Sequence, residues 1–266
     1  MNQKINALPR FNLIMGLLHL LQGIAMVLLA TVIFPDLGDF KPSIIQFYQT
    51  VNPQTFDLFV TSRELFQLPY ALMASSFLLI SALFHFIIVI NKTKYLKMIR
   101  KGYNAFRWIE YSISSSVIIL LTSMLFGVLD IGTLFLIFVA NAVMNLLGLE
   151  MELSNQGRET VNWGPFIWGS VIGFAPWVLI LIYLLGSSNL DIVPNYVWAI
   201  LVAYFVLFNA FPINMYLQYK KIGKWKNYIY GERMYIVLSL VAKTILAWLV
   251  FFGALQATNI IETILG

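Results

Sequence analysis

Lys243 is the residue whose position suggests the most specific chemistry, because it lies within the otherwise uncharged stretch LSLVAKTILAW at residues 238–248. The apolar run around it, from Met234 to Leu255, is long enough to cross a membrane as a helix. An ammonium group at the centre of such a helix costs roughly 2.5–3.5 kcal/mol or more unless it is paired or hydrated. We therefore take Lys243 as a candidate functional residue that needs an anion or water beside it.

Two structural explanations stand beside a functional one for Lys243. Its side chain could extend to the membrane surface, but Lys243 lies near the middle of the run, beyond the reach of a lysine side chain from either end. The second explanation is a purely structural ion pair with Glu110. Replacement of a buried ion pair by apolar residues often leaves the stability of a protein unchanged or raises it. Stability alone therefore does not explain why this chain would carry such a pair.

Glu110 is the candidate partner of this cation, and it belongs to a predicted helix that contains RWIEYSISSS at residues 107–116. Helical spacing places Glu110 and Ser114 on one face of that helix. In the helix of Lys243, Ser239 lies one turn earlier on the same face. A carboxylate and two hydroxyl groups could then surround the amine and keep it charged, because an anion and hydrogen bonds oppose the cost of desolvation.

The elements that carry these residues are predicted to be membrane-spanning helices. The sequence of 266 residues is 60% hydrophobic and 11% charged, whereas soluble proteins carry about 25% charged residues. Such a chain cannot bury its apolar surface in one aqueous core, which predicts an integral membrane protein. The absence of cysteine excludes disulfides and thiolate chemistry. The net charge of +5 is spread over loops beside the membrane, which indicates contact with membrane lipid rather than nucleic acid.

Seven segments have the length and apolarity of spanning helices, and they form one predicted domain over residues 1–266. These segments are 11–34, 68–91, 102–126, 131–150, 164–186, 195–217 and 232–255. The first is too long for the core of a signal peptide and lacks a small-residue cleavage site, so we interpret it as a helix of the mature protein. The expected fold class is an all-α membrane protein, a seven-transmembrane helix bundle.

The first connection, residues 35–66, is the longest and predicts a β-hairpin. Its two halves, KPSIIQFYQTV and TFDLFVTS, are rich in β-branched and aromatic residues, and the VNPQ at their junction offers a proline turn. An isolated hairpin is only marginally stable in water. We therefore expect this one to lie at the membrane surface and to pack on the helices or on a second subunit.

The distribution of Lys and Arg predicts the direction of the helices in the membrane, because basic residues concentrate in cytoplasmic loops. Nearly all of them flank one side: Lys4, Arg10, Lys92, Lys94, Lys97, Arg100, Lys101, Arg107, Arg158, Lys220, Lys221, Lys224, Lys226 and Arg233. The other side holds only Lys41 and Arg63. We therefore expect a multi-pass protein of the cell membrane with a cytoplasmic N-terminus and an extracellular C-terminus.

Other polar residues within the predicted spans also lie at mid-depth or toward the cytoplasmic half. They are His19, His85, Asn145 and Asn214 in that half, and Gln22, Ser81, Asn141 and Asn209 near mid-depth. For the asparagines, hydrogen bonds between helices are the preferred explanation. For the two histidines, such bonding and proton acceptance by a neutral imidazole are equally open. A metal site is not expected, because two histidines without nearby cysteine or carboxylate are too few ligands.

A lysine in the middle of the seventh helix, facing a carboxylate on the third, resembles the microbial retinal proteins. The predicted cytoplasmic N-terminus is similar to that of heliorhodopsins in particular, since ordinary microbial rhodopsins have an extracellular N-terminus. The chain also resembles heliorhodopsins in long stretches spread over most of its length: HLLQG, SALFH, RWIEYSISSS, NAFPINMYLQYKKIGKW and GERMYIVLSLVAKTILAW. The resemblance implies a bundle of the microbial-rhodopsin type with covalently bound all-trans retinal.

The resemblance also implies a role for each matching residue. Lys243 would carry retinal as a Schiff base, and Glu110 would be the counterion, with Ser114 and Ser239 hydrogen-bonded beside it. The hydrated cytoplasmic cavity that takes up the Schiff-base proton would contain His19, His85, Gln22, Ser81 and Arg107. The chromophore would be lined by Asn141, Met144, Gly148, Phe174, Phe208 and Trp248, although simple packing explains each of these equally well. The hairpin would belong to a homodimer interface.

The implied function is light sensing, with isomerisation of all-trans retinal to 13-cis and loss of the Schiff-base proton toward the cytoplasmic cavity. Outward proton pumps usually carry a second carboxylate further along the third helix, but here Leu121 follows Glu110 on that face. No acidic residue lies in the outer half of any predicted span. We therefore expect no net ion pumping and a signalling or regulatory role with an unknown cytoplasmic partner.

Two other function classes stay open. One is a light-driven or light-gated proton transporter, because buried water wires need no titratable residue. The other is a seven-helix receptor or transporter without retinal, in which Lys243 and Glu110 bind an anion or another solute. An enzyme is not expected, because the sequence offers no Ser/His/Asp arrangement or histidine cluster.

Overall fold

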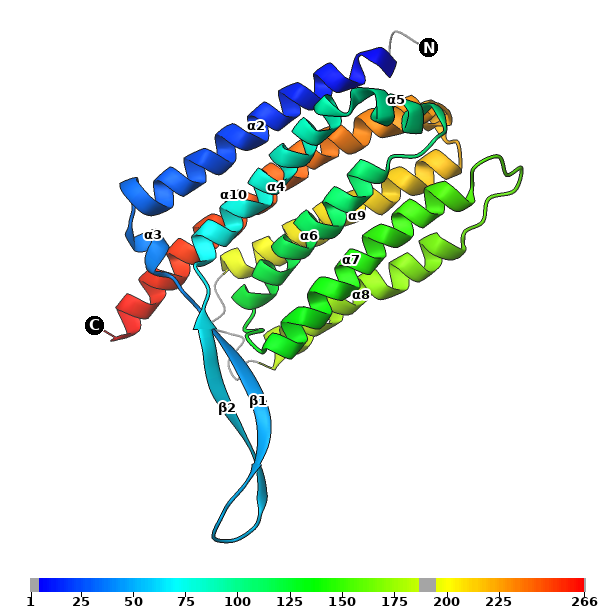
Figure 1. Cartoon of the computed structure of the whole chain (residues 1–266). Helices are drawn as coiled ribbons and strands as arrows, with labels where there is room; N and C mark the ends of the chain where they lie inside the picture. The colour runs from blue at the N-terminus through cyan, green and yellow to red at the C-terminus, as the bar shows by residue number, and fades with distance from the viewer. Residues whose placement is uncertain (1–4, 187–194, 266) are drawn as a thin grey trace.

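Seven membrane-spanning helices form a bundle in the computed structural model, which describes residues 5–186 and 195–265 (Figure 1). The helices are α2 (Leu8–Leu28), α4 (Tyr70–Ile90), α6 (Ala105–Leu125), α7 (Ile131–Ser154), α8 (Gly164–Leu185), α9 (Asn195–Tyr219) and α10 (Tyr228–Leu265). A short π-helical segment, η1 (Leu29–Ile33), extends α2. The seven-helix fold predicted from hydropathy is confirmed.

Two helices are longer than predicted. α7 continues to Ser154 rather than ending at residue 150, and α10 begins at Tyr228 rather than at residue 232 and continues past residue 255. Charged residues normally end an apolar window, but Glu152 and Glu232 are buried here and paired with an arginine inside the bundle. Paired charges therefore allow both helices to extend beyond their apolar runs.

α6 lies in the middle of the bundle, between α4 on one side and α7 on the other (Figure 1). α2 packs on α4, α8 packs on α7, and α10 contacts α2, α4, α6 and α9. The outward faces of the helices expose large apolar side chains such as Leu17, Ile24, Phe135 and Trp168. An apolar exterior around a more polar centre is expected in lipid, and it brings the polar residues of α6 and α10 together.

The interior is apolar in one half and charged in the other. The main apolar core, which includes Tyr70, Ile118, Leu121, Leu246 and Phe251, occupies the half nearer the hairpin. Among the described residues, the buried charged side chains are those of Arg107, Glu110, Glu152, Glu232 and Lys243. They lie at mid-depth or toward the opposite end, so the polarity expected from the sequence is present in the fold.

The two ends of the bundle also differ in surface charge. The short helix α5 (Lys92–Arg100) and the 3₁₀ turn η3 (Gly223–Lys226) lie at the end that holds the N-terminal helix start, and both carry several lysines. The short helix α3 (Asp36–Asp39) and the hairpin lie at the opposite end (Figure 1). The basic end is the one predicted to face the cytoplasm.

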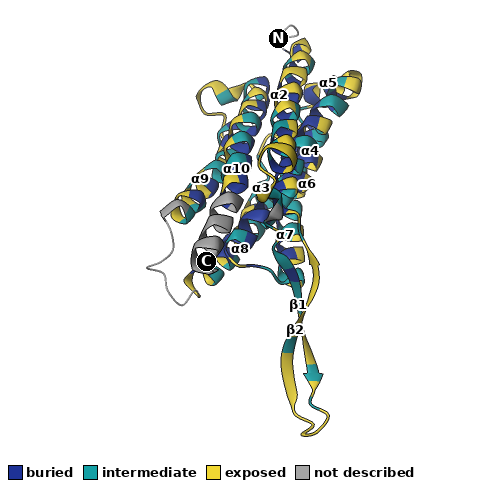
Figure 2. Ribbon diagram, turned by 90° about the vertical axis from the view of Figure 1, so that its left-hand side faces the viewer, coloured by how far each residue is buried: buried dark blue, intermediate teal, exposed yellow. Residues whose placement is uncertain are grey.

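The predicted hairpin is present as an antiparallel pair of strands, β1 (Ser43–Val51) and β2 (Leu58–Gln67), with a bulge between Ile44 and Ile45. Its base is joined to the bundle, because the Ile45 N–H donates to the Leu129 carbonyl at 3.0 Å. Beyond that contact the strands project away from the helices and are largely exposed (Figures 1 and 2). Within one chain, only the base of the hairpin therefore packs on the bundle.

Candidate functional site

Lys243 on α10 and Glu110 on α6 form a buried ion pair at mid-depth. The lysine Nζ also donates hydrogen bonds to Ser81 Oγ at 2.8 Å and to Ser114 Oγ at 2.9 Å. An ammonium group has three N–H donors, and these three oxygens use all of them. The cost of burying the charge is thus offset by one anion and two hydroxyl groups.

The spacing of residues on three helices brings these groups together. Glu110 and Ser114 lie one turn apart on α6, and Ser81 on α4 donates to Glu110 at 2.8 Å. The sequence indicated Ser239 as the second hydroxyl beside Lys243, but Ser81 takes that place. Ser239 lies one turn along α10 and borders a small cavity instead, because the serine on α4 approaches Nζ directly from a neighbouring helix.

Two aromatic rings complete the surroundings of the amine. Nζ lies 4.9 Å from the ring centroid of Tyr111 and 5.4 Å from that of Phe77. Ring faces attract cations, and the effect grows when water is excluded. Both rings are buried, so they also separate the ion pair from bulk water.

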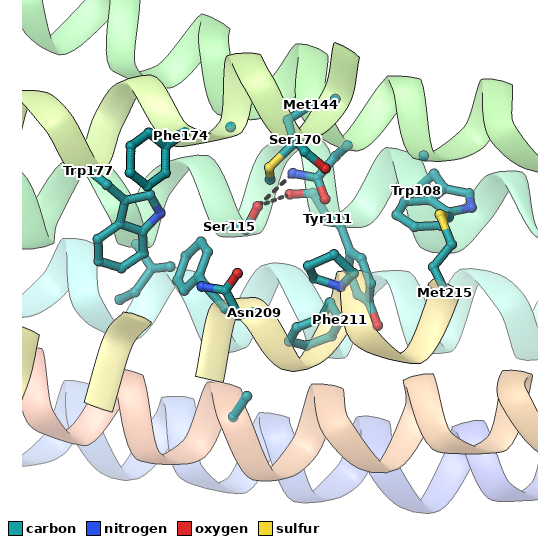
Figure 3. Close-up of a pocket in the computed structure, with 18 of the residues that line it drawn as sticks. Trp108, Tyr111, Ser115, Met144, Ser170, Phe174, Trp177, Asn209, Phe211 and Met215 are labelled. Atoms are coloured by element: carbon teal, nitrogen blue, oxygen red, sulfur yellow. Dashed lines mark hydrogen bonds between the residues drawn. The ribbon is translucent and has the colours of Figure 1, made fainter. Parts of the chain in front are cut away.

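A cavity of about 250 Å³, with Lys243 in its lining, extends between α6, α7, α8 and α9 (Figure 3). Its lining is mostly apolar and aromatic, with Trp108, Tyr111, Phe174, Trp177, Phe208 and Phe211 among the rings. Figure 3 places Phe174 and Trp177 at one end and Trp108 and Met215 at the other. Ligand pockets usually measure about 300–1,000 Å³, so this one fits a slender molecule rather than a bulky one.

Two glycines let the walls of this cavity approach one another. A Cβ at Gly148 would overlap the ring of Trp108, and a Cβ at Gly173 would overlap the side chain of Met144. The wall between α6, α7 and α8 is therefore closely packed. An apolar cavity with a primary amine in its wall fits retinal, a flat polyene with an aldehyde at one end.

Four of the six residues expected to line the chromophore do border the cavity: Met144, Gly148, Phe174 and Phe208. Asn141 and Trp248 do not. Asn141 lies behind the wall, where its amide donates to Ser115 at 2.7 Å and to Ser116 at 3.0 Å. Trp248 turns toward α2 and donates to Gln22 Oε1 at 3.2 Å. The sequence gives the position of each residue along its helix. It does not give the direction in which the side chain points, and that direction takes Asn141 and Trp248 away from the cavity.

A second, much smaller cavity of about 20 Å³ lies beside the ion pair, toward the basic end. Ser81, His85 and Arg107, which were expected in the polar cavity, border it together with Glu110, whereas His19, also expected there, does not. His85 Nδ1 lies 2.8 Å from Asn12 Oδ1, and the ring of His19 stacks on His85 with centroids 5.5 Å apart. Gln22, expected in the same group, is instead the partner of Trp248, so it does not belong to this cavity.

His19 is buried, and neither of its ring nitrogens has a hydrogen-bond partner within the described part of the chain. Arg107 Nε also has no hydrogen-bond partner within the described residues, and the Arg107 side chain borders the small cavity. Buried polar groups are nearly always hydrogen-bonded to protein or water. The two observations indicate ordered water around the small cavity and behind His85.

A charged cluster that the sequence did not indicate lies beside this cavity, toward the basic end of the bundle. Arg107 forms ion pairs with both Glu152 on α7 and Glu232 on α10. Glu232 also accepts hydrogen bonds from Asn104 at 2.7 Å and from Tyr95 at 3.1 Å. Burial, with Glu232 beside it, raises the pKa of the Tyr95 phenol well above its usual range, so this tyrosine is a neutral donor.

Hydropathy missed this cluster because both glutamates fall just outside or at the limit of the predicted spans. A signal was nevertheless present, since Arg107 inside a span requires a counter-charge, and the acidic residues nearest in depth are at the ends of the fourth and seventh helices. Asn12, Asn104 and Tyr95 were not indicated by any sequence pattern. Their contacts depend on how α2, α5 and α10 meet.

A seven-helix membrane bundle, with an interior lysine–carboxylate pair whose lysine lines an aromatic cavity, is the arrangement of a retinal-type rhodopsin. A sequence model of the heliorhodopsin family matches residues 8–255, and the chain belongs to this family. Comparison with curated proteins gives no match. Family membership confirms the resemblance described above and makes the protein a light-sensing rhodopsin whose family implies a retinal chromophore.

Proposed function

We propose that the protein is a photosensor in which retinal is bound covalently at Lys243 and Glu110 is the counterion. The observation that carries the proposal is the buried Lys243–Glu110 pair, whose lysine lines the apolar cavity. Attachment would join the lysine nitrogen to the aldehyde carbon and release one water molecule. Once bound, retinal supplies absorption of visible light and isomerisation from all-trans to 13-cis.

The side chains around Nζ would hold the proton and charge of the linkage. Glu110 balances the positive charge, and Ser81 and Ser114 fix the carboxylate and the nitrogen in one geometry. The aromatic walls restrict the shape that the polyene can take, because close-packed rings resist displacement. These residues therefore determine which photoproduct fits the cavity.

The proton of the linkage would leave toward the small cavity on the basic side. Ser81, His85 and Arg107 border that cavity, whereas Ile118, Leu121 and Leu246 pack in the opposite direction. A pump needs access from each side in turn. The apolar packing beyond Lys243 supports return of the proton to its origin and therefore no net transport, with the basic end in the cytoplasm and the C-terminus outside.

The output of such a cycle would be a signal to an unknown cytoplasmic partner rather than an ion gradient. The exposed hairpin supports a homodimer, because it presents large apolar residues such as Phe47, Leu58 and Val60 to the surroundings. A second copy that covers the hairpin would remove this surface from water.

Reconstitution with all-trans retinal tests the attachment. The full chain should become coloured, Lys243→Ala should stay colourless, and the exposed-site control Lys220→Ala should colour like the unmodified protein. A coloured Lys243→Ala protein would exclude covalent attachment at this residue.

Electrical recording tests the absence of transport. Cells that express the reconstituted protein should show no sustained light-induced current or uncoupler-sensitive pH change, while absorbance recorded in parallel shows that the photocycle runs. A sustained current would favour a light-driven or light-gated transporter instead.

A further inference from the structure

The carboxylates of Glu152 and Glu232, which pair with Arg107, have no part in the function proposed above, although both side chains are buried. We propose that Glu232 holds the proton that leaves the Lys243 site, for as long as the pigment stays deprotonated. This inference rests on the proposed function, because it requires a proton to leave that site. The inference names Glu232 as the carboxylate on which that proton resides.

The charges in the cluster do not balance. Arg107 is the one cation that pairs with Glu152 and Glu232 within the described residues, so three formal charges sum to a net negative charge. An uncompensated charge in a membrane interior is costly. Protonation of one carboxylate would leave a one-to-one ion pair, so the cluster gains from accepting a proton.

Glu232 is better placed than Glu152 to accept it. Glu232 borders the small cavity together with Ser81, Glu110 and Arg107, whereas Glu152 does not. Both carboxylates accept further hydrogen bonds: Glu152 from the Asn104 backbone N–H, the Trp108 indole and the Tyr228 hydroxyl, and Glu232 from the Asn104 amide and the Tyr95 hydroxyl. The cavity therefore connects the counterion of Lys243 with one member of the pair and not with the other.

The small cavity has the size of a single proton-relaying water. A cavity needs about 10–15 Å³ to hold one water molecule, and this one measures about 20 Å³. Its border offers carboxylate, hydroxyl, imidazole and guanidinium groups, and Arg107 Nε there has no partner among the described residues. One water in this space would make hydrogen bonds on both sides and link Glu110 to Glu232.

A chain of side chains runs parallel to this cavity and fixes its geometry. His85 lies 2.8 Å from Asn12, Asn12 donates to Tyr95 at 3.4 Å, and Tyr95 donates to Glu232 at 3.1 Å. The other titratable groups that border the cavity with Glu232 are His85, Glu110, Tyr111 and Arg107, of which a neutral tyrosine and a charged arginine have no site for another proton, and Tyr228 borders the cluster through Glu152. His85 and Glu110 are therefore the alternative proton holders that a test must distinguish.

The proton transfer balances within the protein. The N–H bond at the Lys243 nitrogen breaks, and an O–H bond forms on Glu232. The Lys243–Glu110 site then changes from neutral to one net negative charge, while the cluster changes from one net negative charge to neutral. The reverse transfer restores the dark state, and no ion crosses the membrane.

Infrared difference spectroscopy on the retinal-reconstituted full chain, with visible absorbance recorded on the same sample, tests this inference. The deprotonated state should show a new C=O stretch from a protonated carboxylic acid. Glu232→Gln should lose this band, and Glu152→Asp, the matched control that keeps the charge of the cluster, should keep it at the same frequency. Glu232→Asp retains the acid and should shift the band, which gives a second readout if the glutamine variant folds poorly.

The outcomes separate this inference from the proposed function. A coloured protein that deprotonates in the light but keeps an unchanged band in Glu232→Gln would overturn the inference alone. So would imidazolium bands in place of the C=O band, which would place the proton on a histidine, or a band that shifts only in Glu110→Asp. A colourless protein would overturn the proposed function, and this inference with it.

Discussion

Ser81 on α4 donates to Glu110 on α6 at 2.8 Å, so a third helix holds the ion pair that joins α6 to α10. The same oxygen accepts from Lys243 Nζ at 2.8 Å. Glu110 is therefore oriented by a residue that the sequence placed only in a general polar cavity. Its contribution can be measured separately from that of the ion pair.

Replacement of Ser81 by Ala should destabilise the protein and alter its colour. Loss of a hydrogen-bond partner from a buried charged group lowers the free energy of unfolding by about 1–3 kcal/mol. We expect a lower midpoint of thermal denaturation in detergent and a shifted absorption maximum after retinal reconstitution. Ser76→Ala is the control, because its hydroxyl bonds to the Met73 carbonyl on the same helix, away from the site. Equal effects of both changes would contradict the role of Ser81.

Replacement of Glu110 by Gln should remove the negative charge beside the linkage while keeping the size of the side chain. The proposed positive charge on the nitrogen then loses its partner, so the absorption maximum should move and more of the pigment should be deprotonated at neutral pH. Glu159→Gln, at an exposed loop position, should leave the spectrum as it is. An unchanged spectrum in Glu110→Gln would reject this residue as the counterion.

Replacement of Gly148 by Ala should disturb the cavity wall. The added methyl group would overlap the rigid ring of Trp108, and overpacking of this kind costs about 1–3 kcal/mol. We expect a smaller yield of pigment from a fixed amount of protein. At Gly169 the nearest atom to an added Cβ is the Leu147 Cβ at 3.4 Å, an acceptable contact, so Gly169→Ala should give the normal yield.

Replacement of Arg107 by Gln should leave two buried carboxylates without a cation. Removal of one partner from a buried ion pair costs about 3–5 kcal/mol. We expect a marked fall in the thermal midpoint, with recovery when Glu152→Gln and Glu232→Gln are added to Arg107→Gln. The exposed-site control Arg158→Gln should have little effect. A triple variant no more stable than the single variant would show that charge balance is not what the arginine provides.

Replacement of Trp248 by Phe tests the position that the structure gives to this ring. The indole bonds to Gln22 and lies outside the large cavity, so its loss should leave the absorption maximum unchanged and cost about 1 kcal/mol. Trp177→Phe changes a ring that borders the cavity and should move the maximum. A shifted absorption maximum in Trp248→Phe but not in Trp177→Phe would show that Trp248 lines the chromophore pocket.

The helix count and the central ion pair were predictable from the sequence because lipid imposes a simple rule. Every span must be apolar over about 20 residues, so the few exceptions are conspicuous. Lys243 and Glu110 are such exceptions, and the helical period places Ser114 on the same face as Glu110. The hairpin was likewise visible as two β-prone stretches around a turn.

Contacts that depend on the rotation of one helix against another were not predictable. Gln22 and Trp248 were assigned to different compartments, yet they bond to each other where α2 meets α10. Glu152 and Glu232 were treated as helix ends, because an apolar window cannot recognise a charge whose partner lies on another helix. Hydropathy gives the depth of a residue in the membrane, whereas packing determines its neighbours.

The position of Lys243 between two unlike cavities has a practical consequence. The aromatic cavity extends from the amine in one direction, while the groups that hold Nζ border the small polar cavity in the other. Substitutions of the rings in the first should change hue, whereas substitution in the second of His85 or Glu232, which do not bond to Nζ, should change how long each light response lasts. Spectral range and response time are then separate properties of one molecule, and a designer of optical tools could adjust either without disturbing the other.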